Sequence, residues 1–143
     1  MKIYFAGSIR GGRDDKRKYK QIIQWLKSYG QVLTEHIGLD MLTEKGQTEL
    51  SEEEIYTQDR KWLEASDIII ADVTQVSLGV GYELGLAESL GKRVVCLFDK
   101  SSGKSLSAML RGNTYFEVID YSNVSEIPKI LVEIFKNKTT SLH

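Results

Sequence analysis

The sequence predicts an α/β fold: a single-domain, doubly wound, five-stranded parallel sheet of the Rossmann or flavodoxin-like kind, with helices on both faces. The chain has 143 residues, a typical length for one domain, so residues 1–143 are expected to form a single unit. Apolar runs of strand length alternate with segments of helical spacing, and the connections are short. The run Ile68–Ala71 is continuously apolar, which is typical of a parallel strand buried on both faces.

The first half of the chain begins with a strand at Ile3–Ala6 and a loop at Gly7–Arg13. A helix is predicted from about Asp14, and Gly30 stands where a C-terminal glycine is expected. Gln31–Thr34 is predicted as the second strand. The helical spacing comes from five apolar residues: Tyr19, Ile22, Ile23, Leu26 and Tyr29.

The middle of the chain is less regular. The stretch Glu35–Thr48 gives mixed signals and is interpreted as a loop that holds at most a short helix, before Ser51–Glu54 marks a helix start. Asp67–Val73 is the third and central strand.

The second half repeats the alternation of helix and strand. Ser77–Gly81 leads into a helix that ends near Gly91. Two further strands, a last helix with Pro128 near its start and a frayed tail over 137–143 complete the prediction. These strands and the helix are Arg93–Phe98, Phe116–Tyr121 and Ile127–Lys136.

Composition narrows the class of protein. Hydrophobic residues make up 41% and charged residues 27%, which excludes disordered, collagen-like and coiled-coil chains. A net charge of -1 argues against a nucleic-acid polymer as partner. The single Cys96 suits a reducing cytoplasm, and apolar runs such as Val94–Phe98 fall far short of the roughly 20 residues that span a membrane. We therefore expect a cytoplasmic protein without a membrane partner.

The Gly7–Arg13 loop has the character of a phosphate cradle. It places three glycines and two arginines between a strand and a helix, where backbone N–H groups and the helix N-terminus favour an anion. The spacing matches neither the dinucleotide nor the triphosphate motif. A tight turn with exposed arginines is an equally open interpretation. In a doubly wound sheet, ligands bind where strand order reverses, so the loops after Ala6 and Val73 should flank the site.

A second helix N-terminus at Ser77–Gly81 can bind the same phosphate, although ordinary N-capping by Ser77 is the simpler interpretation.

Glu83 follows on the apolar face of that helix, and Asp59 stands mid-helix on an apolar face. A contact with the helix dipole for Glu83 and a buried ion pair for Asp59 are the alternatives. Two inward carboxylates beside a phosphate cradle point to cleavage of a glycosidic bond.

Three further residues are weaker candidates. Tyr4 precedes the cradle and can orient a carboxylate, or it is simply a core aromatic with a satisfied hydroxyl. His36 lacks a partner at ligand spacing, so no metal site is predicted. Cys96 lies in an apolar strand and is expected to be an inert core residue.

Several ordered motifs together resemble the 2'-deoxynucleoside 5'-phosphate N-hydrolases, a family within the nucleoside 2-deoxyribosyltransferase superfamily. The resemblance runs from Ile3 to about Tyr121, with Asp72 standing where relatives can carry Glu. The motifs are Tyr4–Arg13, Leu33–His36, Gln58–Asp59, Ser77–Gly85 and Leu106–Met109.

The resemblance implies a cofactor-free homodimer that cleaves deoxynucleoside monophosphates into a free base and 2-deoxyribose 5-phosphate. It implies Glu83 as the nucleophile, Asp59 as the acid and Tyr4 as the residue that orients the nucleophile. The substrate-binding residues that it implies in the chain itself are Gly7, Ser8, Ile9, Arg10, Gly11, Gly12, Arg13, His36, Ser77 and Gly79. It implies three more that reach in from the partner subunit: Ser107, Ala108 and Met109. Transfer of deoxyribose to another base, and a non-catalytic nucleotide sensor, remain the alternative functions.

Overall fold

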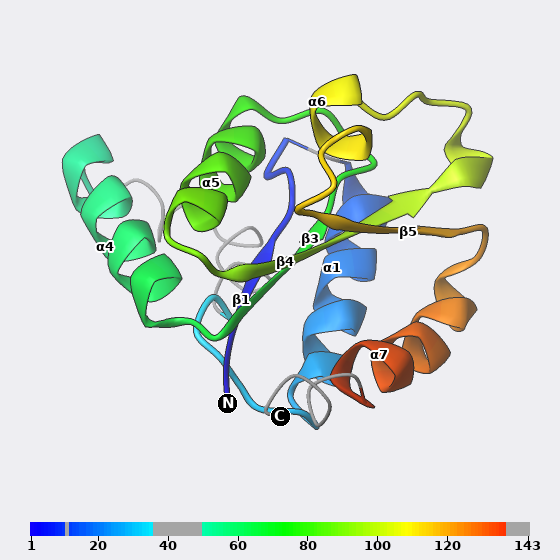
Figure 1. Ribbon diagram of the computed structural model, residues 1–143, viewed down its shortest axis with the longest axis horizontal. Helices are drawn as coiled ribbons and strands as arrows, with labels where there is room; N and C mark the ends of the chain where they lie inside the picture. The colour runs from blue at the N-terminus through cyan, green and yellow to red at the C-terminus, as the bar shows by residue number, and fades with distance from the viewer. Residues whose placement is uncertain (11, 36–49, 137–143) are drawn as a thin grey trace.

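The chain is built on one five-stranded sheet in which every pair of neighbouring strands is parallel (Figure 1). A computed structural model describes residues 1–10, 12–35 and 50–136. The strand order is β2-β1-β3-β4-β5, so the predicted doubly wound α/β fold is confirmed. The strands are β1 (Lys2–Ala6), β2 (Gln31–Val32), β3 (Ile68–Asp72), β4 (Arg93–Asp99) and β5 (Glu117–Tyr121).

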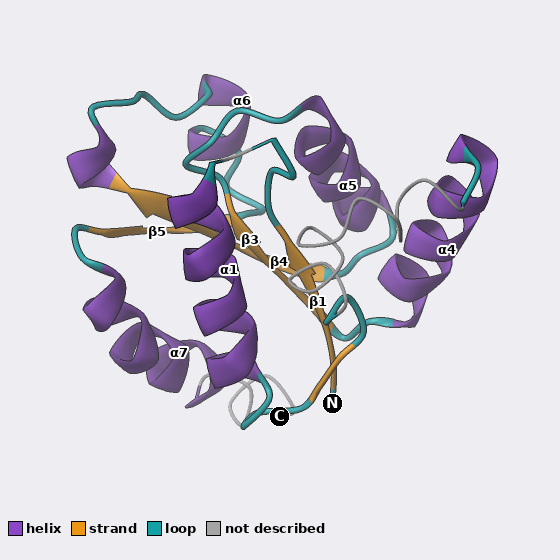
Figure 2. Cartoon of the chain, turned by 180° about the vertical axis from the view of Figure 1, so that it is seen from behind, coloured by secondary structure: helices purple, strands orange, loops and turns teal. Residues whose placement is uncertain are grey.

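Helices cover both faces of the sheet. Figures 1 and 2 show α1 and α7 together on one face and α4 and α5 on the other, with the short α6 beyond the strand ends. The helices are α1 (Arg13–Leu26), α4 (Glu52–Ala65), α5 (Leu78–Ser89), α6 (Ala108–Arg111) and α7 (Ile127–Lys136). Two 3-10 turns, η1 (Lys100–Ser102) and η2 (Val124–Glu126), complete the described elements.

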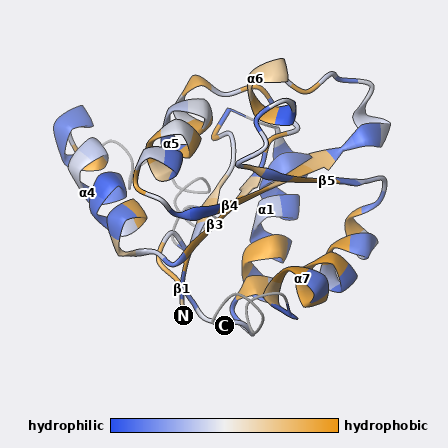
Figure 3. Ribbon diagram, in the orientation of Figure 1, coloured by the Kyte–Doolittle hydropathy of each residue, from blue (hydrophilic) through white to orange (hydrophobic). Residues whose placement is uncertain are grey.

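Successive side chains of β1 point to opposite faces and so enter two separate cores. Ile3 and Phe5 pack in the core beneath α1 and α7, whereas Tyr4 and Ala6 pack in the core beneath α4 and α5. Figure 3 shows the apolar residues concentrated along the strands, on α7 and on the C-terminal half of α1. Cys96 is buried in the second core, as predicted, and burial raises the pKa of its thiol to about 12.

The second strand is shorter than predicted. The predicted strand Gln31–Thr34 ends at Val32, because the Thr34 side chain replaces the backbone as the partner of β1. Its Oγ1 accepts a hydrogen bond from the Phe5 N–H at 2.8 Å and donates one to the Phe5 carbonyl at 2.9 Å. The stretch from 36 to 48 and the tail 137–143, for which a loop with a short helix and a frayed end were predicted, lie outside the described residues.

The register of the central strands brings two loops together. Ala6, the last residue of β1, pairs with Ala71 of β3, so the loop after β1 and the loop after β3 begin side by side. Strand order reverses at this pair, since β2 lies on one side of β1 and the later strands on the other. This is the edge of a doubly wound sheet at which ligands bind.

A buried polar cluster closes the α1 side of the same edge. Asp72 is fully buried, and its Oδ2 lies 3.2 Å from the Lys18 Nζ and accepts a 2.6 Å hydrogen bond from the Tyr121 hydroxyl. Its Oδ1 accepts a hydrogen bond from the Thr74 N–H at 3.0 Å. These contacts link α1, β3 and β5, and the ion pair compensates the cost of burying the Asp72 charge.

Gly7 is required by the packing of α1 on the sheet. A Cβ at this position would lie 2.8 Å from Cζ of the fully buried Tyr19 ring, which has no room to move. We predict that Gly7→Ala lowers the free energy of unfolding by about 1–3 kcal/mol through overpacking, as measured by urea denaturation.

Gly85→Ala is the matched control, because Gly85 is at an exposed position in the middle of α5, where a Cβ meets nothing within 4 Å. The control is expected to raise stability by about 0.5–1 kcal/mol, the ordinary gain of alanine over glycine in a helix. Equal effects of the two substitutions would contradict the packing explanation.

Candidate active site

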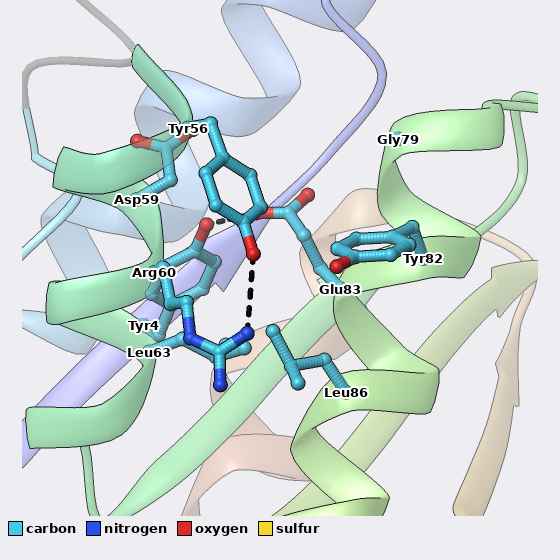
Figure 4. Close-up of a pocket in the computed structure, with 9 residues that line it drawn as sticks. All are labelled: Tyr4, Tyr56, Asp59, Arg60, Leu63, Gly79, Tyr82, Glu83 and Leu86. Carbon is cyan, nitrogen blue, oxygen red and sulfur yellow. Dashed lines mark hydrogen bonds between the residues drawn. The ribbon is translucent and has the colours of Figure 1, made fainter. Parts of the chain in front are cut away.

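The centre of the candidate site is a hydrogen bond between a strand and a helix on the opposite layer. The Tyr4 hydroxyl, from β1, donates to Oε2 of Glu83, from α5 (Figure 4). Tyr4 is wholly buried and belongs to the core beneath α4 and α5, so its ring is fixed by packing and its hydroxyl has one defined direction. The phenol thus holds the Glu83 side chain in a single orientation.

Helix α4 supplies the second carboxylate. It begins at a capping box in which the Ser51 hydroxyl accepts from the Glu54 N–H and the Glu54 carboxylate accepts from the Ser51 N–H. Two turns later, Asp59 lies on the side of α4 that faces α5, on the other side of Tyr4 from Glu83 (Figure 4). All three side chains line one pocket of about 180 Å³ between the two helices.

This pocket changes the ionisation of its groups. Burial raises the pKa of Glu83 to about 7; the Tyr4 hydrogen bond acts in the opposite direction, and the charge of Asp59 adds to the rise. Burial, and then the Glu83 charge, raise the pKa of the Tyr4 phenol. The phenol therefore stays protonated and remains a donor, while Glu83 changes charge near neutral pH. A carboxylate poised in this way is typical of a catalytic site.

The first predicted phosphate-binding loop lies at the end of β1. Ser8 is buried and its Oγ accepts a hydrogen bond from the Arg10 N–H at 3.2 Å, while the Ile9 and Arg10 side chains are exposed. Gly12 is the N-cap of α1 and makes no side-chain capping bond, so the first N–H groups of that helix face the loop without a side-chain cap. Arg13 opens the helix, and Gly11 lies outside the described residues.

The second predicted helix N-terminus is that of α5. The Ser77 Oγ accepts a hydrogen bond from the Val80 N–H at 3.2 Å, which confirms the capping interpretation of this serine. Gly79 stands in the first turn and also lines the pocket of Tyr4 and Glu83. Glu83 itself is half-buried one turn further along and bonded to Tyr4, so the helix-dipole alternative does not account for it.

The three residues expected to come from a partner subunit lie apart from the Tyr4–Glu83 pair of their own chain. Ser107 caps α6, Ala108 begins it, and Met109 follows with its side chain exposed. Ser107 and Met109 line a groove of about 410 Å³ on the other side of α5, which shares Tyr82 with the catalytic pocket. The chain thus does not bring them to its own Tyr4–Glu83 pair. His36 lies outside the described residues.

Sequence reasoning missed three residues of the pocket. Tyr56 and Arg60 of α4 and Tyr82 of α5 line it beside Asp59 and Glu83 (Figure 4). The signal was present, since Tyr56, Asp59 and Arg60 are spaced i, i+3 and i+4 and therefore share a helix face. They were passed over because exposed tyrosine and arginine are ordinary on a helix surface.

The described residues contain no group of three or more His, Cys, Asp or Glu side chains placed to hold a metal ion. No described helix is long and apolar enough to cross a membrane. The pocket between α4 and α5 offers two carboxylates and a phenol.

The sequence is similar to those of known proteins along nearly its whole length. The family model described as nucleoside 2-deoxyribosyltransferase matches residues 3–136. The 5-hydroxymethyl-dUMP N-hydrolase of Danio rerio is 50% identical over 142 residues, which are 97% of this chain and 99% of that protein. The protein of the same name from Esox lucius is 52% identical over 141 residues, 95% and 97% of the two chains.

A solved structure shares the fold. The Clostridium botulinum CMP N-glycosidase BcmB aligns with a TM-score of 0.68 and 17% sequence identity, over 94% of this chain and 99% of that chain. The family match covers nearly the whole chain, and the two relatives are about half identical to it from end to end. The chain therefore belongs to the nucleoside 2-deoxyribosyltransferase family.

Proposed function

We propose that this protein is a cofactor-free N-glycosidase that hydrolyses 2'-deoxynucleoside 5'-monophosphates to a free base and 2-deoxyribose 5-phosphate. The observation that carries the proposal is the Tyr4–Glu83 hydrogen bond in a pocket shared with Asp59, at the strand ends where doubly wound sheets bind ligands. The names of the relatives support it, and they make 5-hydroxymethyl-dUMP the first substrate to test.

In the first step, an ionised Glu83 oxygen attacks C1' of the sugar and forms an ester. The C1'–N bond breaks, its electron pair stays with the base, and Asp59 delivers a proton to the departing base. In the second step, water attacks C1' as Asp59 takes its proton, which releases 2-deoxyribose 5-phosphate and restores both carboxylates. Tyr4 donates to Glu83 throughout, and so orients it and favours its charged form.

The phosphate is proposed to lie between the two helix N-termini. Ser8, Arg10, Ser77 and the Gly79 backbone are the groups that would hold it, and the rest of the Gly7–Arg13 loop would line the sugar and base. The missing side-chain cap on α1 supports this placement, because its first N–H groups then have a ligand to bind. An unphosphorylated nucleoside would leave the arginines of the loop without a partner.

The active form is proposed to be a homodimer in which Ser107, Ala108 and Met109 complete the partner's site. An exposed apolar patch around the α5–α6 groove supports this: Leu78 is 94% exposed, Val76 81% and Met109 80%. Apolar side chains this exposed and this close together are typical of an interaction surface. Tyr82 lines both the groove and the catalytic pocket, so a subunit seated in the groove would lie beside the Glu83 of its neighbour.

The proposed activity is tested by incubating the protein with 5-hydroxymethyl-dUMP, the four deoxynucleoside monophosphates, their ribonucleotides and the unphosphorylated deoxynucleosides. Base release is expected from deoxymonophosphates. Glu83→Gln is expected to lower kcat by at least about 1,000-fold and leave substrate binding intact, because it removes the nucleophile but keeps an acceptor for Tyr4. An added acceptor base separates hydrolysis from deoxyribosyl transfer. Binding without release from any substrate would favour the sensor.

Glu83 should link activity and stability to pH in opposite directions. Because the nucleophile must be ionised, kcat/KM is expected to fall as the pH drops below about 7. A folded-state pKa of about 7, raised from 4.5, favours folding at low pH, and this stabilisation is lost as the pH rises through 7. The free energy of unfolding of wild type should therefore fall by up to about 3 kcal/mol relative to that of Glu83→Gln between pH 5 and pH 8, as measured by urea denaturation.

Tyr4→Phe serves as the control for this measurement. Without the phenol that favours the charged form, the acid limb of the activity profile should move to higher pH. Two results would contradict the assignment of the titrating group to Glu83. One is an acid limb that stays at the same pH in Tyr4→Phe, and the other is a Glu83→Gln variant whose stability changes between pH 5 and pH 8 as much as that of wild type.

The shared site predicts complementation between two inactive variants. Glu83→Gln removes the nucleophile, and Ser107→Asp places a negative charge in the partner's site, where it repels the anionic substrate. A mixture of the two should regain about a quarter of the wild-type activity, since half of the dimers are mixed and one of their two sites is intact. Activity that stays at the level of the separate variants, in a protein that is dimeric by light scattering, would exclude a site completed by the partner.

A further inference from the structure

Two tyrosines and an arginine line the pocket between α4 and α5. The Arg60 Nη1 donates a 3.1 Å hydrogen bond to the Tyr56 hydroxyl, one turn earlier on α4. The Tyr56 ring faces Tyr82 of α5, with ring centroids 6.4 Å apart and planes tilted by 55°. Figure 4 shows the Arg60 guanidinium below the Tyr56 hydroxyl and between the two helices. The arginine is therefore held in place at the edge of the pocket.

Arg60 is the one cation among the described residues that line this pocket. Its contacts are to the Tyr56 hydroxyl and, 3.7 Å from Nε, to the exposed Glu64 carboxylate one turn later on α4. A guanidinium carries five N–H donors, so these contacts leave donors for a ligand in the pocket. The Tyr82 hydroxyl and Arg60 lower the pKa of Tyr56, in accord with three polar groups close together.

In the proposed reaction, charge develops on an atom of the base that the two carboxylates do not stabilise. As the C1'–N bond breaks, its electron pair spreads from the ring nitrogen of a pyrimidine onto the carbonyl oxygen beside it. Asp59 can deliver one proton to the base, but the charge that develops on a second atom needs a separate donor. A cationic donor that is held in place beside the base stabilises this charge more than solvent does, because it requires no reorganisation during the reaction.

We propose that Arg60, positioned by Tyr56, contacts the departing base and donates a hydrogen bond to the carbonyl oxygen next to the glycosidic nitrogen of a pyrimidine. This inference rests on the proposed function and adds a leaving-group contact to it. Asp59 and Arg60 both project from α4 and line the same pocket (Figure 4), which brings a base bound in that pocket close to both side chains.

The contact is tested by changing both of its partners. Wild type and Arg60→Met are compared on dUMP and on 2-thio-dUMP, whose sulfur is a poor hydrogen-bond acceptor. Arg60→Met is expected to lower kcat/KM for dUMP by about ten- to a hundredfold, the range for a charged hydrogen bond. The ratio of kcat/KM for dUMP to that for 2-thio-dUMP should fall by at least about tenfold in the variant, because the thio substrate has no contact to lose.

Lys61→Met is the matched control. Lys61 is the next residue on α4 and carries the same charge, but it is exposed and lines a separate hollow on the outer side of the helix. This variant should leave both rates and their ratio within about twofold of wild type. Tyr56→Phe keeps the ring and removes the hydroxyl that holds Arg60, so it should lower the ratio by a smaller factor, about threefold.

The outcomes separate the inference from the function on which it rests. If Arg60→Met slows both substrates equally, the arginine contacts another part of the substrate, such as the phosphate, and the inference is wrong. Hydrolysis of purine deoxymonophosphates alone would likewise overturn the inference and leave the N-glycosidase proposal standing. Loss of the proposed function itself would show as no base release from any deoxymonophosphate.

Discussion

The hydrogen bond from Tyr4 to Glu83 is the contact on which the rest of the site depends. Burying a carboxylate is costly, and here the cost raises the pKa of Glu83 to about 7. The phenol offsets part of that cost and also fixes the direction of the side chain. Its position follows from the alternation along β1, which turns Tyr4 toward α5, and from the start of α5 at Leu78, which turns Glu83 toward the sheet.

The two faces of the sheet carry different clusters of polar side chains. On the α1 side, Lys18, Asp72 and Tyr121 form a closed cluster of charges and hydrogen bonds. On the α4 and α5 side, the pocket keeps one carboxylate at a pKa near neutrality. Both clusters lie at the carboxyl ends of the strands. The first links α1 to the ends of β3 and β5 through a buried ion pair, and the second surrounds the proposed active site.

Much of the fold was predictable because it rests on local patterns. The five strands and the helix starts at Ser51 and Ser77 follow from apolar runs and capping residues. The early end of β2 was not predictable, since it depends on the Thr34 side chain finding Phe5, a contact across 29 residues. In the site, Glu83 and Asp59 stood out as charges on apolar helix faces.

The Tyr4 hydroxyl and the Tyr56–Arg60 pair were harder to recognise. Spacing places a tyrosine in a core strand but says nothing of which group its hydroxyl meets on another helix. Arg60 has no unusual position along α4, and it lines a pocket only because α4 and α5 pack together. Contacts of this kind depend on tertiary packing, which no window of sequence contains.

The contact between Gly7 and the Tyr19 ring has a consequence for recognising active members of this fold. Because the buried ring leaves no space for a side chain, the glycine is kept by packing whether or not a ligand binds above it. A relative that had lost its chemistry would still retain the glycine at the head of the loop. A glycine-rich loop therefore identifies the architecture, whereas a tyrosine on the first strand paired with a glutamate one turn into the facing helix would identify the enzyme.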